Sequence, residues 1–260
     1  MSTQSYAVRD SATMLRRNLR HVRRYPSMAA STVGFPVIFL LLFGYVFGST
    51  LGAGLGGGRA GYIDYLVPGI LVLTVASGSV STAVSVCMDM TEGIVARFRT
   101  MAIARVSVLT GHVLGSVIQT MVGVVLVAGV GLLMGFRSSA GLAGWLGAAG
   151  LLVLLTVALT WLSVAFGVVA DRPETASNLP MPLLLLPLIG SGFVPTASMP
   201  PGLRQFAEYQ PFTPVTQTVR GLLMGTPIGH NWITAIAWCV GIGVGGYLWA
   251  KAAFARKTQR

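Results

Sequence analysis

Long apolar stretches alternate along the chain with short segments rich in arginine. Six of these stretches are as long, or nearly as long, as a helix must be to cross about 30 Å of hydrocarbon. They cover residues 33–49, 66–88, 113–134, 142–169, 179–194 and 233–254. Except for Lys251, near the end of the last stretch, their central parts contain no Asp, Glu, Lys or Arg. The pattern predicts an all-α integral membrane protein in which residues 1–260 form a single domain with six transmembrane helices.

Two of the stretches depart from the ordinary length of a spanning helix. Residues 142–169 exceed what the hydrocarbon core requires, so we expect this helix to tilt or to extend into water. Residues 179–194 are short for a span and include Pro180, Pro182 and Pro187. Because proline removes a backbone donor, we expect the fifth helix to be kinked.

Two segments outside the six stretches have amphipathic patterns. In residues 6–24, apolar side chains recur at helical spacing among arginines, which predicts an interfacial helix against anionic lipid. A basic tail without fixed structure is the alternative. Residues 195–229 are too polar and proline-rich to span, yet they contain two groups of apolar residues at about helical spacing: Leu203 and Phe206, then Val219, Leu222 and Leu223. We expect two short helices there, which form an outer re-entrant segment or cover the exit.

The distribution of charge orients the predicted helices. Only 10% of the residues are charged, against about 25% in soluble proteins, and the net charge is +11. Because the charges lie between apolar runs, we favour basic loops of a membrane protein over nucleic-acid binding. Of the 18 Lys and Arg residues, all fall on the side of the N-terminus except Arg59, Arg137, Arg204 and Arg220. The positive-inside rule then predicts two cytoplasmic termini, and the arginine-rich composition suggests a bacterial cytoplasmic (inner) membrane.

The second predicted span carries more serine and threonine residues than any other of the six stretches. Tyr62 and Tyr65 precede its apolar run at the outer side, where we expect an aromatic belt. Further along, four small polar residues lie on roughly one helical face: Thr74, Ser77, Ser81 and Ser85. Such spacing favours close contact between helices. A share in a substrate path or in a dimer seam is the alternative.

No motif in the sequence supplies catalytic chemistry. The glycine patterns at residues 52–57 and 241–246 lack the strand and helix of a dinucleotide site, and we expect the second to permit close helix packing. The sequence contains no Gly-Lys-Ser/Thr phosphate loop, and its three histidines are scattered. We therefore predict no enzyme activity, no metal site and no cofactor bound by this chain. Since ion-coupled transporters place ionisable groups within the membrane, energy for uphill transport would have to come from another subunit.

The predicted cytoplasmic loop, residues 89–112, combines exposed apolar side chains with arginines. Asp89 and Glu92 have the spacing of a capping box, which predicts that a short helix begins there. They are followed by Arg97, Phe98, Arg99, Met101, Ile103 and Arg105. Apolar anchors between charges suit docking to a soluble partner. A helix lying on anionic headgroups is the alternative.

The same loop resembles that of the type-2 ATP-binding-cassette permeases, notably the daunorubicin-resistance permeases. Their pattern is approximately E-G-x-x-x-R-F-R-x-M-P-I-A-R-x-S-x-L-x-G. This sequence matches it from Glu92 to Gly111, and departs at Ala102, where the family usually has proline. A second likeness runs from Phe193 to Gly225, the outer segment between the family's fifth and sixth spans. Together with six spans, the resemblance covers nearly the whole chain.

The resemblance implies a permease subunit of an exporter that moves an amphipathic drug, lipid or secondary metabolite. Two permeases, identical or siblings, would pair in the lipid, and ATPase subunits that bind ATP and Mg would dock from the cytoplasm. The coupling residues would be Glu92, Arg97, Phe98, Arg99, Met101 and Arg105, with a smaller contact at Asp171, Arg172 and Glu174. An outer gate would include Leu203, Phe206, Glu208 and Arg220. An exporter of polysaccharide precursors, and a scaffold or immunity protein that transports nothing, are the alternatives.

Overall fold

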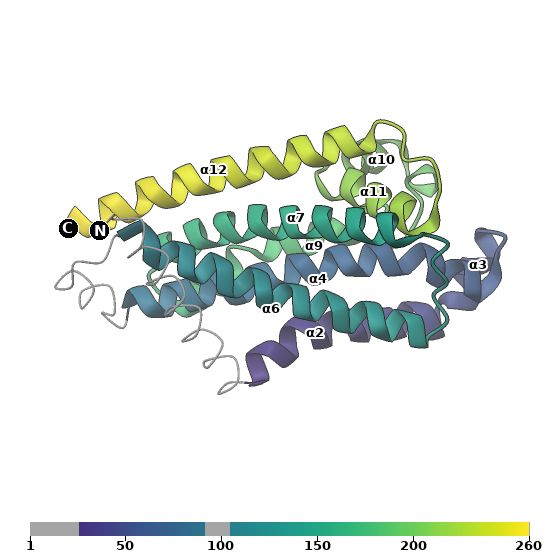
Figure 1. Ribbon diagram of the computed structural model, residues 1–260, viewed down its shortest axis with the longest axis horizontal. Helices are drawn as coiled ribbons and strands as arrows, with labels where there is room; N and C mark the ends of the chain where they lie inside the picture. Colours follow the sequence, from purple (N-terminus) through teal and green to yellow (C-terminus); the bar gives the residue numbers. More distant parts are fainter. Residues whose placement is uncertain (1–25, 92–104, 260) are drawn as a thin grey trace.

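Every regular element in the described part of this computed structural model is a helix (Figure 1). The structure describes residues 26–91 and 105–259. The predicted interfacial helix at residues 6–24 lies outside these ranges, as does most of the predicted coupling loop. Helices of membrane length run side by side along the long axis of the molecule, which is the arrangement that an all-α membrane protein requires.

The first predicted span is a helix that bends at its far end. Helix α2 (Pro26–Leu41) continues directly into a π-helical turn, η1 (Leu42–Val46), and α3 (Gly48–Gly54) then leaves at a bend of 69°. Phenylalanines recur every fourth residue, and the Phe39 and Phe43 rings both contact Phe193. This aromatic row attaches α2 to the turn after α9.

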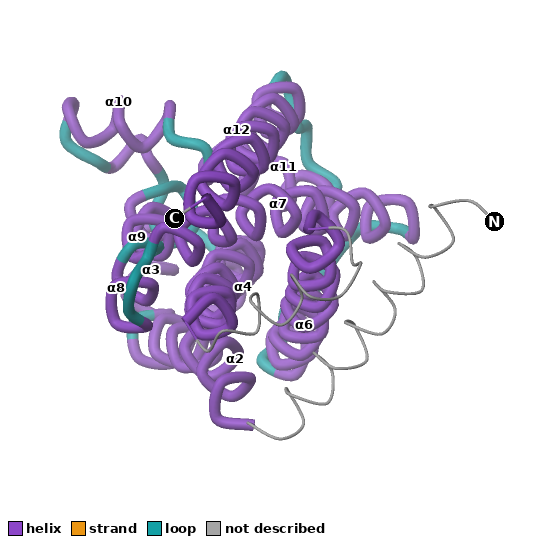
Figure 2. The backbone as a smooth tube through the Cα atoms, turned by 90° about the vertical axis from the view of Figure 1, so that its left-hand side faces the viewer, coloured by secondary structure: helices purple, strands orange, loops and turns teal. Residues whose placement is uncertain are grey.

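Helix α4 (Gly58–Thr91) is the centre of the bundle. Its 34 residues extend for about 51 Å, well beyond the predicted 66–88. The end-on view in Figure 2 shows α4 surrounded by α2, α6, α7 and α9, and most of its apolar window is buried. Asp89 lies inside this helix, so the prediction that a new helix begins at Asp89 is wrong. The helix continues because the sequence has no Gly or Pro between Gly78 and Thr91 to end it.

Three more helices are long and apolar enough to cross a membrane. They are α6 (Arg105–Leu133), α7 (Leu142–Val169) and α12 (Asn231–Gln259). The bounds of α7 are those predicted from the sequence. With α4 they make four candidate spans in the described chain, or five if the bent segment from α2 to α3 is counted.

The fifth predicted span, residues 179–194, contains only one short helix, α9 (Met181–Ile189). A separate short helix, α8 (Pro173–Asn178), precedes it, and Pro180 lies between the two. Nine residues of helix extend for only about 14 Å, too little to cross hydrocarbon alone. The prolines explain the pieces, because Pro180 and Pro182 suit only a helix start, and Pro187 removes a donor from the last turn.

The segment between the fifth and sixth predicted spans contains the two expected short helices. After a 3-10 turn, η2 (Thr196–Ser198), come α10 (Pro201–Tyr209) and α11 (Phe212–Met224). Helix α10 is amphipathic and projects from the bundle in Figure 2, with Leu203 and Phe206 about half exposed. Helix α11 is buried, with Val219 and Leu223 fully covered, and ends at Gly225 in a left-handed conformation.

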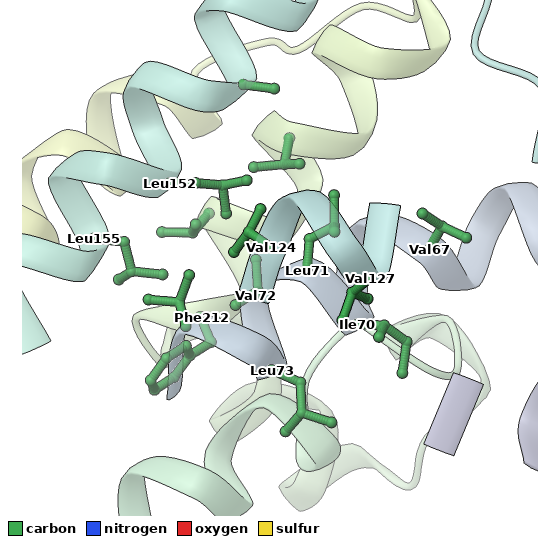
Figure 3. Close-up of a cluster of buried hydrophobic side chains, with 14 of the residues drawn as sticks. Val67, Ile70, Leu71, Val72, Leu73, Val124, Val127, Leu152, Leu155 and Phe212 are labelled. Atoms are coloured by element: carbon green, nitrogen blue, oxygen red, sulfur yellow. The ribbon is translucent and has the colours of Figure 1, made fainter. Parts of the chain in front are cut away.

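The hydrophobic core forms where α4 meets α6, α7 and α11. Figure 3 shows Leu71 and Val72 of α4 near Val124 of α6, Leu152 of α7 and Phe212 of α11. Glycines permit the closest approaches between helices. A Cβ on Gly246 of α12 would lie 2.6 Å from the backbone nitrogen of Leu162 in α7. The expectation that the glycines of the sixth span serve helix packing is confirmed for Gly246 and Gly243, whereas Gly241 has no neighbour within 4 Å.

Candidate functional site

The polar chemistry of the described chain gathers at the two ends of the bundle. We call the end that carries Thr91, Ala170 and Lys257 the proximal end, and the end that carries α3 and the loop 134–141 the distal end; they lie at the left and right of Figure 1. Between them, every polar side chain that is fully buried is uncharged. A functional site with charged groups must therefore lie at one of the ends.

The proximal end presents an exposed turn between α7 and α8. Helix α7 ends at Ala170, and the extended Arg172 then leads into α8 with Pro173 as its first residue. Asp171, Arg172 and Glu174 are all exposed. Glu174 lies in the first turn of α8, where the helix dipole favours a negative charge. The residues predicted as the smaller ATPase contact thus form one accessible, charged turn.

The α7–α8 turn is held by two neighbouring helices. The Lys257 ammonium of α12 donates to the carbonyl oxygens of Val168 (3.0 Å) and Ala170 (3.1 Å) and to Asp171 Oδ1 (3.3 Å). From α4, the Cys87 thiol donates to the Ala170 carbonyl at 3.5 Å. Cys87 and Ala170 are buried together with Ala176 of α8. The sequence analysis did not identify Lys257, whose only signal was its place at the end of the last apolar stretch.

Most of the predicted coupling residues lie outside the described residues. These are Glu92, Arg97, Phe98, Arg99 and Met101, whereas Arg105 is the first residue of α6. The segment they occupy leaves α4 after Thr91 and returns at Arg105, and both points are at the proximal end (Figure 1). The predicted loop and the exposed α7–α8 turn are therefore at the same end of the bundle.

The serine and threonine face of α4 is largely covered within this chain. Thr74 and Ser77 are buried, and each hydroxyl donates to the carbonyl one turn earlier in α4. A Cβ on Gly78 would lie 2.4 Å from Thr120 Oγ1, so α6 approaches closely here. Ser81 and Ser85 are half-buried. The part of this face around Thr74 and Gly78 packs against α6. A role of the face in a substrate path or dimer seam stays a prediction.

At the distal end, Arg220 of α11 joins three parts of the chain. Its Nε and Nη2 donate to the Tyr65 carbonyl of α4 at 3.2 and 3.0 Å, and Nη2 also donates to the Ser191 carbonyl at 2.7 Å. The guanidinium carbon lies 3.7 Å from the centre of the Tyr65 ring. Burial lowers the pKa of Arg220, but an arginine stays protonated at any pH a protein meets. We call this group of contacts the distal clamp.

Two tyrosines of α4 complete the distal clamp. Tyr62 donates to the Phe193 carbonyl at 3.1 Å, and Tyr65 donates to the Ser191 carbonyl at 2.8 Å. A Cβ on Gly69 would lie 2.4 Å from the Gly192 oxygen, so the turn after α9 touches the α4 backbone. The prediction of an aromatic belt is wrong for Tyr62, which is buried, and Tyr65 also turns inward. Carbonyls freed by the broken fifth segment need these donors.

The predicted outer gate does not form one group. Leu203, Phe206 and Glu208 lie on α10, where Glu208 pairs with Arg204 at 2.7 Å, whereas Arg220 belongs to the distal clamp. A hollow of about 1040 Å³ lies beside α10. Its walls come from α9, α10 and α12 and include Leu186, Phe206, Tyr209, Gln210 and Trp238. Phe206 and Glu208 therefore border an open hollow, while Arg220 joins α11 to α4 and to the turn after α9.

No group of three or more His, Cys, Asp or Glu residues that could hold a metal ion occurs in the described ranges. In the described chain, membrane-length helices with an interior free of buried charge are the architecture of a multi-pass membrane protein. Residues 10–224 match the family described as "ABC-2 type transporter". The chain belongs to this family and is the membrane permease of an ATP-binding-cassette transporter.

Two relatives have sequences similar to that of this chain. It is 30% identical over 256 residues to "Daunorubicin resistance ABC transporter permease protein DrrB1" of Streptomyces coeruleorubidus, covering 98% of this chain and 86% of the relative. It is 25% identical over 177 residues to "Probable doxorubicin resistance ABC transporter permease protein DrrC" of Mycobacterium tuberculosis, covering 68% and 64%. The resemblance predicted from the sequence is confirmed. Membership indicates a transport subunit rather than an enzyme, and implies partnership with an ATP-binding subunit.

Proposed function

We propose that this permease exports an amphipathic drug, lipid or secondary metabolite from the cytoplasm or the inner leaflet, using ATP hydrolysed by a separate subunit. The observation that carries the proposal is that 98% of the chain aligns, at 30% identity, with a daunorubicin-resistance permease. A second relative is named for resistance to doxorubicin. The interior of the described chain contains no buried charged side chain. This supports ATP as the energy source, because an ion-coupled transporter would need ionisable groups there.

In this proposal the proximal end faces the cytoplasm of a bacterium and the chain crosses the membrane six times. The α8–α9 segment would be the fifth crossing, broken at Pro180. Ala176 of this segment packs with Cys87, and the Phe193 carbonyl bonds Tyr62. Since Tyr62 and Cys87 are separated by about 37 Å along α4, the segment extends over most of the bundle. That extent supports a crossing even though α9 alone is too short.

The ATPase subunit would dock on two proximal surfaces, the loop 89–112 and the turn 171–175. Asp171, Arg172 and Glu174 are accessible and bear both signs of charge, which suits orientation of a soluble partner. Phe98 and Met101 would supply the apolar anchors. The helix at 6–24 would lie on anionic lipid beside them. Arg172, as a rim charge, should contribute to the rate and salt dependence of docking rather than dominate affinity.

A second permease, identical or a sibling, would complete the path through the membrane. Helix α10 would then cover the outer exit, with Leu203 and Phe206 facing substrate or lipid. Because α10 is held to the bundle through α11 and the distal clamp, its position would depend on Arg220. This chain would bind no cofactor of its own, and ATP and Mg would stay on the partner.

Co-expression with the ATPase subunit encoded beside the gene tests the proposal. The complex should co-purify from detergent, hydrolyse ATP and drive uptake of daunorubicin into inside-out vesicles. The matched control is the same preparation with a Walker-lysine variant of the ATPase, which should bind this chain without transport. A permease that retains no ATPase, or whose complex leaves daunorubicin and extracted lipids unmoved, would contradict the proposed function.

A further inference from the structure

Lys257 makes three polar contacts with the α7–α8 turn at the proximal end, and no other described side chain makes more contacts of this kind with the turn. Two of its acceptors, the carbonyls of Val168 and Ala170, belong to the end of α7. The last carbonyls of a helix have no partner within the helix, and a cation placed there also meets the negative end of the helix dipole. The Lys257 side chain is 34% exposed, whereas Asp171 is 90% exposed. The contact with α7 is thus more than a surface ion pair.

Helices α7 and α12 pack closely along their length. A Cβ on Gly243 would touch Ala158, and one on Gly246 would collide with Leu162. Toward the proximal end, aromatic rings from the two helices meet edge to face. The ring centroids are 4.9 Å apart for Trp161 and Tyr247 and 5.4 Å apart for Phe166 and Trp249. Such a seam leaves little room for the two helices to slide past each other.

The distal end of the same helix pair supports the outer segment. A Cβ on Gly144 of α7 would lie 2.5 Å from the Leu222 carbonyl of α11, and Gly147 faces the Leu222 side chain. The Ser138 and Ser139 hydroxyls, just before α7, donate to the carbonyls of Leu223 and Met224. The pair α7–α12 therefore has the α7–α8 turn at one end and α11 at the other.

We propose that Lys257 is a positioning residue that joins the α7–α8 turn to α12, so that a displacement of this turn moves α7 and α12 together and reaches α10 and α11. The inference rests on the proposed function, in which the ATPase subunit acts on the turn. Without the ammonium, the turn keeps its contact with Cys87 of α4 and loses its polar contacts with α12, so that only the apolar packing of Val168 with Ala250 and Phe254 still joins the two helices there. A movement of α8 is then absorbed at the turn. The neighbouring Arg256 is exposed and lacks this role.

A labelling experiment on the complex with its ATPase tests this positioning role without any knowledge of the substrate. Tyr209 in α10 is 79% exposed, and both native cysteines are buried, so Tyr209→Cys provides a single accessible thiol in the described chain. The rate of maleimide labelling at this position is measured with and without ATP. The variants Lys257→Met, Lys257→Arg and Arg256→Met are compared in this background.

We expect ATP to change the labelling rate in the parent and in Arg256→Met. Lys257→Met should reduce that change roughly fivefold or more, the size of a typical coupling between sites, while ATPase co-purification stays normal. Lys257→Arg should keep most of the response, because a guanidinium can donate to the same oxygens. If Lys257→Met does not accumulate, Asp171→Asn, which removes the negative charge from one of the three acceptors, should reduce the response about twofold.

The outcomes distinguish a failure of this positioning role from a failure of the proposed function. A full ATP response in Lys257→Met, or an equal loss in Arg256→Met, overturns the positioning role and leaves the proposed function intact. An unchanged response in Asp171→Asn, when it stands in for Lys257→Met, overturns the role as well. A parent complex that binds ATPase but shows no response refutes coupling to α10. A parent that binds no ATPase refutes the proposed function itself.

Discussion

Replacing Arg220 with methionine should release the outer segment without unfolding the bundle. The side chain donates charged hydrogen bonds to the Tyr65 and Ser191 carbonyls and covers the Tyr65 ring. A charged hydrogen bond contributes about 1.5–3 kcal/mol, and a cation–π contact about 0.5–2 kcal/mol. Two bonds at about 1.5 kcal/mol and a ring contact of about 0.5 kcal/mol total about 3.5 kcal/mol. Because Arg220 is half-buried, we reduce this to about 3 kcal/mol.

Hydrogen exchange of backbone amides measures this free energy locally. At about 1.4 kcal/mol per factor of ten, Arg220→Met should speed exchange in α11 about a hundredfold through more frequent opening. Amides in the middle of α6, which has no contact with the clamp, should exchange at the parent rate. Arg220→Lys should fall between the two, since an ammonium cannot reproduce the planar geometry of the guanidinium.

Arg204→Met provides the matched control in the same outer segment. Arg204 also makes a short contact, 2.7 Å to Glu208, but both side chains are substantially exposed. Exposed pairs of this spacing contribute about 0.3–0.5 kcal/mol, so exchange in α11 should change by about twofold at most. If Arg220→Met changes exchange in α11 by no more than Arg204→Met does, the structural role of the distal clamp is wrong.

Four further predictions follow from the structure and the proposal. Gly69→Ala should destabilise the turn after α9 by about 1–3 kcal/mol, because its methyl group would meet the Gly192 backbone. Gly61→Ala, in the same helix, has open space around its methyl group and should be neutral or stabilising. Thermal inactivation of the two variants measures the difference. Phe98→Ala should weaken ATPase association about thirtyfold, the equivalent of about 2 kcal/mol for a buried anchor; unaltered co-purification and export would sink this assignment. A cysteine at Gly57 should react with an impermeant reagent in intact cells and one at Ala96 only after lysis, the reverse labelling being incompatible with the proposed orientation. The purified chain should hydrolyse no ATP, and activity that survives removal of every ATPase subunit would refute this.

The long helices were predictable because their signal is local. An uninterrupted apolar run of sufficient length has few alternatives to a helix in lipid, and the bounds of α7 follow directly from residues 142–169. The two short outer helices were also visible, because the spacing of Leu203 and Phe206 reflects helical periodicity. The Arg204–Glu208 contact also has a local signal, because the two residues are four positions apart on one helix.

Contacts between distant residues were not predictable in the same way. Tyr62 and Tyr65 carry the composition of an aromatic belt, and only the folded chain shows that their hydroxyls face the turn after α9. The chain leaves helical geometry after α9, and the carbonyls of Ser191 and Phe193 in that turn receive their donors from α4 and α11. Lys257 likewise looked like one more basic residue of a cytoplasmic tail. A single sequence carries no signal for such pairings.

The separation of charge from the interior explains why both ends of the molecule matter. The described interior contains no buried charged residue, so it offers no internal group that could respond to an ion gradient or a membrane potential. A movement must then start at an end and be carried by packed helices. Of the described helices, α7 contacts the exposed proximal turn through its last residues and α11 through its first. Its close seam with α12 makes these two helices a continuous packed connection between the ends. Lys257 holds the proximal turn to this pair, whereas Arg220 holds α11 to α4 and to the turn after α9.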